Sequence, residues 1–230
     1  MFHWLEKHPF LFSVAVFVVV AFAGLIEVVP HFAEASRPTI GTKPYTTLEL
    51  AGRHVYIKNS CNACHSQLIR PFKAETDRYG DYSLSGEYAY DRPFLWGSKR
   101  TGPDLMRVGN YRTTDWHENH MKDPQGVVPG SIMPAYTWMF DNMADIDTAY
   151  AEQVTVNALF SVPYNTPIPM KDGTTETVEL AGSAAEAKAA ALEEAKAIAA
   201  DMKTQSVKDA VAAGKIPEIV ALIAYMNSLK

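Results

Sequence analysis

Two cysteines and a histidine stand within one pentapeptide of this chain, Cys61-Asn62-Ala63-Cys64-His65. Two thiols separated by two residues can form thioether bonds to the two vinyl groups of a haem, and the adjacent histidine then lies under the iron as an axial ligand. The 230-residue sequence contains no other cysteine. The pattern therefore predicts a redox protein with one covalently bound haem c, held by Cys61, Cys64 and His65.

Two other interpretations of the same cysteines stay open. A zinc site would need two further ligands, which would have to be histidines or carboxylates. A thioredoxin-like pair is expected after a strand in a βαβ unit. The segment before Cys61, residues 48–57, instead has apolar residues at helical spacing. This spacing favours haem c over the redox disulfide.

A low-spin haem needs a second axial ligand, and methionine opposite histidine raises its reduction potential. Met133 is the predicted ligand, because the proline that follows it restricts it to extended geometry and stiffens the loop that presents its sulfur. Met106 and Met121 are the alternative methionines. His117 and His120, three residues apart on one helical face, are the bis-histidine alternative; otherwise we expect them to be structural or to hydrogen-bond a haem propionate.

A long apolar segment precedes the haem motif. Residues 9–29 are almost wholly apolar and are interrupted only by Ser13 and Glu27. At about 1.5 Å per residue this run covers the roughly 30 Å hydrocarbon layer of a bilayer, so we expect a transmembrane anchor in contact with lipid. A cleaved secretory signal is the alternative, since residues 33–35 resemble a cleavage site, but the run is longer than the usual ~7–15 residues.

Charge does not orient this segment, because Lys7 stands on one side and Arg37 and Lys43 on the other. Covalent haem c is attached on the outer face of the bacterial inner membrane. We therefore expect a single-pass inner-membrane protein with a cytoplasmic N-terminus and with periplasmic residues after Pro30. The chain has 21 basic and 26 acidic residues, a balance that gives no basic surface for nucleic acid.

The predicted fold class is mainly α, with one N-terminal transmembrane helix and a periplasmic domain. The expected divisions are an anchor at 1–30, a linker at 31–45, and a cytochrome c domain at 46–230 with an insertion at about 141–215. Periodicity and capping residues predict helices at 46–59, 114–121, within 141–160, at 184–202 and from 217 onward. We expect residues 71–96 to form a long ordered loop and helix 184–202 to be exposed.

Several segments carry a resemblance to a known family. They are residues 61–72, 78–88 and 90–105, the pair Trp116-His117, His120, and Met133-Pro134. Over these segments the chain resembles the membrane-anchored monohaem cytochrome c subunit of cbb3-type cytochrome c oxidase, a respiratory haem–copper terminal oxidase. The likeness runs from the anchor to about residue 136 and resumes in the C-terminal helix, so nothing is transferred to the insertion.

The resemblance implies a class I cytochrome c domain, in which the helix before the haem motif crosses the C-terminal helix and the Pro103 carbonyl accepts a hydrogen bond from His65. It also implies that electrons pass from a soluble or diheme cytochrome c, through this haem, to haem b of the catalytic haem–copper subunit. Oxygen reduction and proton pumping occur in that larger subunit. An iron with both axial positions filled cannot bind oxygen, so this subunit would have no catalytic centre of its own.

Further contacts are expected around the haem. The residues that we expect to neutralise or hydrogen-bond the haem propionates are Arg70, Trp96, Lys99 and Arg100. Ser98 matches a position near which, in that family, a calcium ion bridges haem propionates of the catalytic subunit. The aromatic loop at 79–96 is more apolar and longer than a surface loop that only connects two elements. We expect it to pack on the catalytic subunit.

Three alternative functions stay open. The first is the monohaem subunit of nitric oxide reductase, although the extended 66–105 sequence argues against it. The second is a haem enzyme or gas sensor with an open iron position, which carbon monoxide binding would reveal. The third is a free membrane-tethered cytochrome c, which would not co-migrate with a large multi-haem protein.

Overall fold

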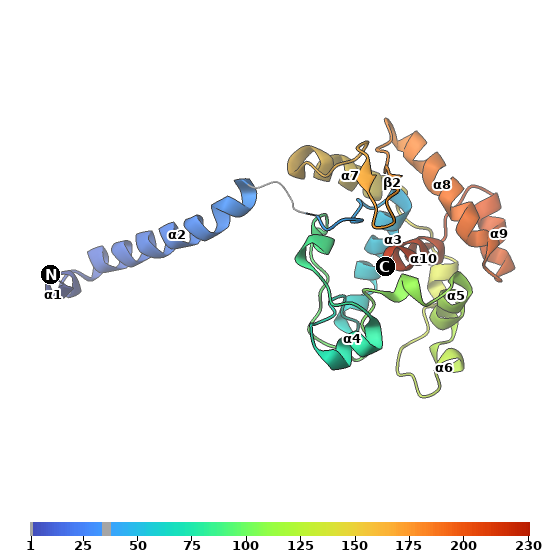
Figure 1. The fold of residues 1–230 in the computed structure, drawn as a ribbon, viewed down its shortest axis with the longest axis horizontal. Coiled ribbons are helices and arrows are strands. Elements are labelled where there is room, and N and C mark those ends of the chain that lie inside the picture. The colour runs from blue at the N-terminus through green and yellow to red at the C-terminus, as the bar shows by residue number, and fades with distance from the viewer. Residues whose placement is uncertain (1, 34–37) are drawn as a thin grey trace. The chain divides into compact units, whose positions relative to one another are not determined.

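A computed structural model describes residues 2–33 and 38–230 of the chain (Figure 1). The chain divides into two compact units, Met1–Arg37 and Pro38–Lys230, and each is described by itself. Both are built mainly from helices, and the described residues contain only two short strands. The mainly helical fold class predicted from the sequence is thus confirmed.

The N-terminal unit consists of a short helix, α1 (Phe2–Glu6), and a long helix, α2 (Pro9–Ala33). The stretch Pro9–Val29 has a mean hydropathy of 2.6, and none of it is buried within the protein. By length and composition α2 could cross a membrane, as expected. It ends at Ala33, beyond residue 31, where the linker was expected to begin. Part of the expected cleavage site lies outside the described residues.

The larger unit is organised around two crossing helices, α3 (Thr47–Lys58) and α10 (Glu218–Ser228). Helix α3 begins with a capping box, since Thr46 accepts a hydrogen bond from the backbone of Glu49 and the Glu49 carboxylate accepts one from the Thr46 backbone. A Cβ placed on Gly52 would lie 1.9 Å from the backbone oxygen of Ala221. Only glycine therefore permits this close crossing.

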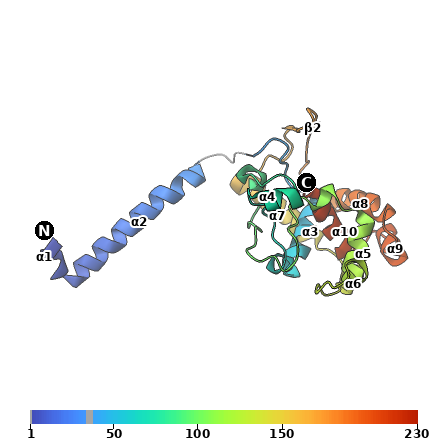
Figure 2. The same cartoon turned by 60° about the horizontal axis from the view of Figure 1, so that its bottom comes forward.

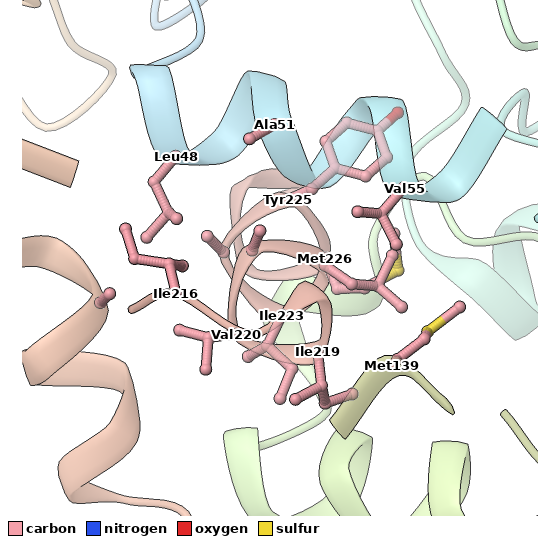
Figure 3. Close-up of a cluster of buried hydrophobic side chains, with 14 of the residues drawn as sticks. Leu48, Ala51, Val55, Met139, Ile216, Ile219, Val220, Ile223, Tyr225 and Met226 are labelled. Carbon is pink, nitrogen blue, oxygen red and sulfur yellow. The ribbon is translucent and has the colours of Figure 1, made fainter. Parts of the chain in front are cut away.

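The side chains at this crossing form the main hydrophobic core (Figure 3). In the close-up, Leu48, Ala51 and Val55 project from α3 towards α10. The core residues labelled there from outside α3 are Met139, Ile216, Ile219, Val220, Ile223, Tyr225 and Met226. The Tyr225 hydroxyl donates to Oε1 of Gln67 at 2.9 Å, which connects the crossing to the segment that follows the haem motif.

The expected insertion contributes helices and a hairpin to the same unit. These are α7 (Ile146–Phe160), strands β1 (Ile168–Pro169) and β2 (Thr175–Glu176), α8 (Ala184–Ala200) and α9 (Gln205–Ala212). The strands are antiparallel, with Ile168 opposite Glu176. Figures 1 and 2 show α8 and α9 next to each other beside α10.

Helix α8 is not the exposed helix that the sequence predicted. Its alanines at every fourth position, 187, 191, 195 and 199, are buried, and the helix packs against α3, α7 and α10. Alanine at this spacing gives a smooth stripe along which other helices can approach closely. The opposite face carries the charged residues that suggested exposure.

The segment expected as a loop at 71–96 contains two helical elements, α4 (Lys73–Tyr79) and η2 (Ser85–Tyr88). Gly80, with φ of 99°, ends α4 in a conformation that favours glycine. The helix predicted at 114–121 is present as α5 (Thr114–Lys122), and the side chain of its N-cap, Thr113, accepts a hydrogen bond from the Trp116 backbone. The remaining short helices are η1 (Cys61–Ala63), η3 (Val108–Asn110), α6 (Pro124–Val127) and η4 (Thr137–Phe140).

Candidate haem site

The cysteine motif forms a tight turn directly after α3. Ser60 takes a left-handed conformation, with φ of 55°, and η1 follows it. The His65 backbone N–H donates to the Cys61 carbonyl at 2.9 Å, which closes the turn. Cys61 is buried and Cys64 is exposed, and both are free thiols. The motif thus presents two thiols and one imidazole from a single rigid turn.

The His65 ring is held by the segment that contains Gly102 and Pro103. Its Nδ1–H donates to the Pro103 carbonyl at 2.8 Å, and the Gly102 backbone N–H donates to the Cys64 carbonyl at 2.9 Å. A Cβ on Gly102 would lie 2.2 Å from Cε1 of His65, so no larger residue fits beside the ring. The structure therefore brings together the histidine and the carbonyl that the resemblance paired.

This arrangement determines which His65 nitrogen can bind a metal. Because a carbonyl can only accept a hydrogen bond, Nδ1 carries the proton and Nε2 carries the lone pair. Burial lowers the pKa of His65, although the Pro103 carbonyl and Asp104 act in the opposite direction. The neutral ring with a free Nε2 lone pair is the form that binds haem iron.

Asp104 is the hydrogen-bonding centre of the loop around the motif. Its buried carboxylate accepts from the Ser66 hydroxyl at 2.7 Å, from the Leu68 backbone at 2.8 Å and from the Met106 backbone at 2.9 Å. These bonds join the two sides of the loop that encloses His65. No role was predicted for Asp104 from the sequence, although an aspartate in a Gly-Pro-Asp turn commonly hydrogen-bonds nearby backbone groups.

Two of the arginines expected near the propionates pair with Glu75. Arg100 donates to Glu75 at 2.8 Å and to the Ser66 hydroxyl at 2.7 Å, and Arg70 also pairs with Glu75. Arg100 and then Arg70 hold the pKa of Glu75 at about 2. The visible task of both arginines is to fix α4 against the haem-motif loop. Their contact with propionates stays a prediction.

Trp96 lies beside the motif on a partly exposed aromatic surface. Its ring stacks on Phe94 with centroids 4.5 Å apart, and Tyr88 meets its edge at 5.7 Å. The Trp96 carbonyl accepts from the Gln67 backbone at 2.8 Å. Gly97 follows with φ of 68°, and a Cβ there would lie 3.2 Å from the His65 carbonyl oxygen. The turn after Trp96 is therefore packed directly on the haem motif.

No group of three or more histidine, cysteine or acidic side chains that could hold a metal ion is found among residues 2–33 and 38–230. The described residues thus give no support to the zinc alternative. Ser98 and Lys99 are exposed on the turn after Gly97. A calcium ion near Ser98 would need most of its ligands from another subunit, and this contact stays a prediction.

Met133 lies in a loop that is attached to α5. The Tyr136 backbone N–H donates to the Met121 carbonyl at 2.8 Å, and the Met133 N–H donates to the Ser131 hydroxyl at 3.2 Å. Met133 is half-buried and packs against the hydrophobic cluster that includes Cys61. Met106 and Met121 are buried in hydrophobic clusters. Met133 stays the predicted axial ligand.

The two histidines of α5 have unsatisfied ring nitrogens. Nε2 of His117 and Nδ1 of His120 are buried and have no hydrogen-bond partner among the described residues. Burial, then His120 and Arg112, lower the pKa of His117 to about 4. Burial, then His65, lower the pKa of His120. Both shifts favour the neutral form of the ring.

These observations fit a covalently attached haem. The donor set of two thiols, one imidazole and one thioether is that of a haem c with histidine and methionine ligands. The Pro103 carbonyl and the close approach of Gly102 fix the His65 imidazole, as an iron ligand requires.

Comparison with known protein families matches residues 2–230 to the family described as "Cytochrome C oxidase, mono-heme subunit/FixO". The match includes the motif, the Met133 loop, the insertion and the C-terminal helix. A comparison with curated proteins gave no match.

Proposed function

The chain belongs to the family of mono-haem cytochrome c oxidase subunits, and from this membership we propose that it is the electron-transfer subunit of a cbb3-type haem–copper oxidase in aerobic respiration. The family implies one haem and a catalytic oxidase subunit as partner. We propose that the haem is covalent haem c and that it supplies a one-electron Fe(III)/Fe(II) couple. Residues Cys61, Cys64, His65 and Met133 would hold it.

The observation that carries this proposal is the confinement of the His65 ring beside two free thiols. Gly102 and the Pro103 carbonyl fix both the plane and the tautomer of the ring. Such outer contacts orient a ligand and raise its basicity. A histidine that only filled space would not require glycine at a position where a Cβ would lie 2.2 Å from its Cε1 atom.

Each protein group has one task in this proposal. The thiol of Cys61 or Cys64 adds across a vinyl C=C bond, so that the sulfur bonds to one carbon, the proton goes to the other and no electron is lost. His65 and Met133 would both hold the iron, and with both bound no site would remain for oxygen. We therefore propose that the subunit transfers one electron at a time and does no oxygen chemistry itself.

We propose that the electron donor is a diheme cytochrome c subunit or a soluble cytochrome c, and that the acceptor is haem b of the catalytic subunit. The aromatic surface next to the motif supports contact with the catalytic subunit. Phe94 is 47% exposed and Trp96 is 40% exposed, although the two rings stack face to face. Exposed apolar groups of this size often mark protein interfaces. Ser98 on the next turn is the proposed contact to calcium at this interface.

The proposed topology follows from the anchor and the haem. Helix α2 is apolar over Pro9–Val29, which is consistent with a membrane anchor. We propose that the N-terminus is cytoplasmic and that residues 46–230 form the periplasmic haem domain, in the bacterial inner membrane. Proton pumping belongs to the catalytic partner in this proposal.

The test is purification of the complex in mild detergent, followed by mass analysis of this subunit and visible spectroscopy. We expect the mass of the polypeptide plus one haem, a c-type spectrum and co-migration with a subunit that contains haem b. Unmodified cysteines, or zinc bound to them, would contradict the haem assignment. Migration of the subunit alone would instead indicate a free tethered carrier, and carbon monoxide binding to its reduced haem would indicate an open iron position.

Substitution tests the proposed interface. We expect the double variant Phe94→Ala, Trp96→Ala to detach the subunit from the catalytic partner or to slow oxidation of its haem. The matched control is Tyr111→Ala, because Tyr111 is 48% exposed and lies outside the aromatic loop. Unchanged assembly and turnover in the double variant would contradict the interface.

A further inference from the structure

Helix α5 contains a buried polar atom that the proposed function does not use. Nδ1 of His120 has no hydrogen-bond partner among the described residues. A buried ring nitrogen that is left without a partner destabilises the folded protein. A ring nitrogen in this position therefore indicates a hydrogen-bonding task.

The neighbours of His120 connect it to the loop that carries Met133. The loop that carries Met133 is attached to the residue after His120, because the Tyr136 N–H donates to the Met121 carbonyl at 2.8 Å. His120 thus precedes the residue of α5 to which the Met133 loop is hydrogen-bonded.

The orientation of the His120 ring is fixed by stacking. Trp116 lies parallel to it, with centroids 4.5 Å apart and an angle of 16° between the planes. The Arg112 guanidinium lies 4.2 Å from the centroid of the Trp116 ring and provides a cation–π contact. A ring held in this way can offer a hydrogen bond in a constant direction.

We propose that Nδ1–H of His120 donates a hydrogen bond to the thioether sulfur of Met133 when that sulfur binds the haem iron. This inference rests on the proposed function and assigns His120 as a positioning residue. A thioether sulfur is a weak acceptor, and neither Met133 nor His120 needs another partner for the bond to form. The bond draws electron density from the sulfur, which makes it a weaker donor to Fe(III) and so favours Fe(II).

Loss of this bond should therefore lower the midpoint potential. A hydrogen bond of ordinary net strength corresponds to about a five-fold change in the equilibrium constant for reduction. At 59 mV per tenfold change for one electron, this is about 40 mV. The methionine–Fe(III) bond should become stronger at the same time, so a competing ligand such as imidazole should displace Met133 less readily.

The experiment compares His120→Leu and His120→Gln in the assembled complex. His120→Leu removes the donor and should lower the potential, shift the near-infrared band of the methionine–Fe(III) bond and raise the imidazole concentration needed to displace Met133. His120→Gln keeps an N–H donor and should restore most of the wild-type values. His54→Leu is the matched control, because His54 pairs with Glu152 on the α3–α7 side, and it should leave all three properties unchanged.

Two outcomes would overturn the inference. One is a His120→Leu protein with an unchanged near-infrared band and unchanged potential. The other is a changed potential with an unchanged methionine band, which would identify a haem propionate as the acceptor. Failure of the proposed function is distinguishable, because the wild-type protein would then lack either the haem or the methionine band.

Discussion

Replacing Gly102 by alanine tests how tightly the His65 ring is confined. The new Cβ would lie 2.2 Å from Cε1 of His65 and 2.7 Å from each ring nitrogen. Carbon atoms pack best at about 3.5–4.0 Å, so the ring has to move by roughly 1.3 Å or more. The 2.8 Å hydrogen bond from Nδ1 to the Pro103 carbonyl would be broken by such a shift.

The cost can be estimated from these two effects. Overpacking of a tight site costs about 1–3 kcal/mol, and loss of the hydrogen bond costs about 0.5–1.5 kcal/mol. We therefore expect a loss of about 3 kcal/mol in the free energy of unfolding, which lowers the melting temperature by roughly 6–12 °C for a domain of this size. Without the bond at Nδ1 the imidazole is less basic, so any haem that remains ligated should have a raised midpoint potential.

The assay measures thermal unfolding, covalent haem per subunit and midpoint potential on the same preparations. Gly182→Ala is the control, because a Cβ there meets only the end of the flexible Glu186 side chain, at 3.1 Å. A Gly102→Ala protein that matched this control in melting temperature, haem content and potential would refute the confinement of His65 by Gly102.

Three further predictions concern the core, the sixth ligand and the acid stability. Gly52→Ala places a Cβ 1.9 Å from the Ala221 carbonyl oxygen and should destabilise the α3–α10 crossing by at least about 1–3 kcal/mol; denaturant unfolding with an unchanged midpoint would contradict this. Met133→His should keep a low-spin haem and lower its potential, because imidazole is a stronger donor than a thioether, whereas an unchanged spectrum of Met133→Ala would show that the ligand lies elsewhere. Arg100 and Arg70 hold the pKa of Glu75 at about 2, below the unfolded value of about 4.3, so the stability from this carboxylate is complete above about pH 4.3 and is lost as the pH falls towards 2. Glu75→Gln should therefore be less stable than the native protein at neutral pH, and a difference that did not shrink between about pH 4 and pH 2 would count against the assignment.

Helices that carry their own boundary signals could be predicted from the sequence. The apolar spacing of residues 48–57 predicted α3, and the structure adds the capping box of Thr46 and Glu49 at its start. Helix α10 begins after Pro217, as its proline and apolar spacing indicated. Helix α4 was missed, because its polar residues have no apolar face, and its position depends on the pairing of Glu75 with Arg70 and Arg100.

The candidate site could be predicted only where the chemistry is local. Cys61, Cys64 and His65 form one motif. Gly102 acts through its contact with the His65 ring, which lies 37 positions earlier in the sequence, and this contact is visible only in three dimensions. Asp104 is similar, since its partners Ser66 and Leu68 come from the other side of the loop. The burial of α8 was missed because alanine is a strong helix former at exposed and buried positions alike.

His65 and Met133, the two proposed iron ligands, are held in different ways, and this difference separates the consequences of mutation. On the His65 side, Gly102 and the Pro103 carbonyl fix one ring through a steric contact and a hydrogen bond. On the Met133 side, the loop is attached to α5 through the backbone bond from Tyr136 to Met121. Changes near His65 should therefore reduce stability and haem attachment together, whereas changes near Met133 should move the potential while the thioether bonds keep the haem content constant. Covalent haem content and midpoint potential should be measured on the same variants. If the two properties changed together both for substitutions near His65 and for substitutions near Met133, this division would be wrong.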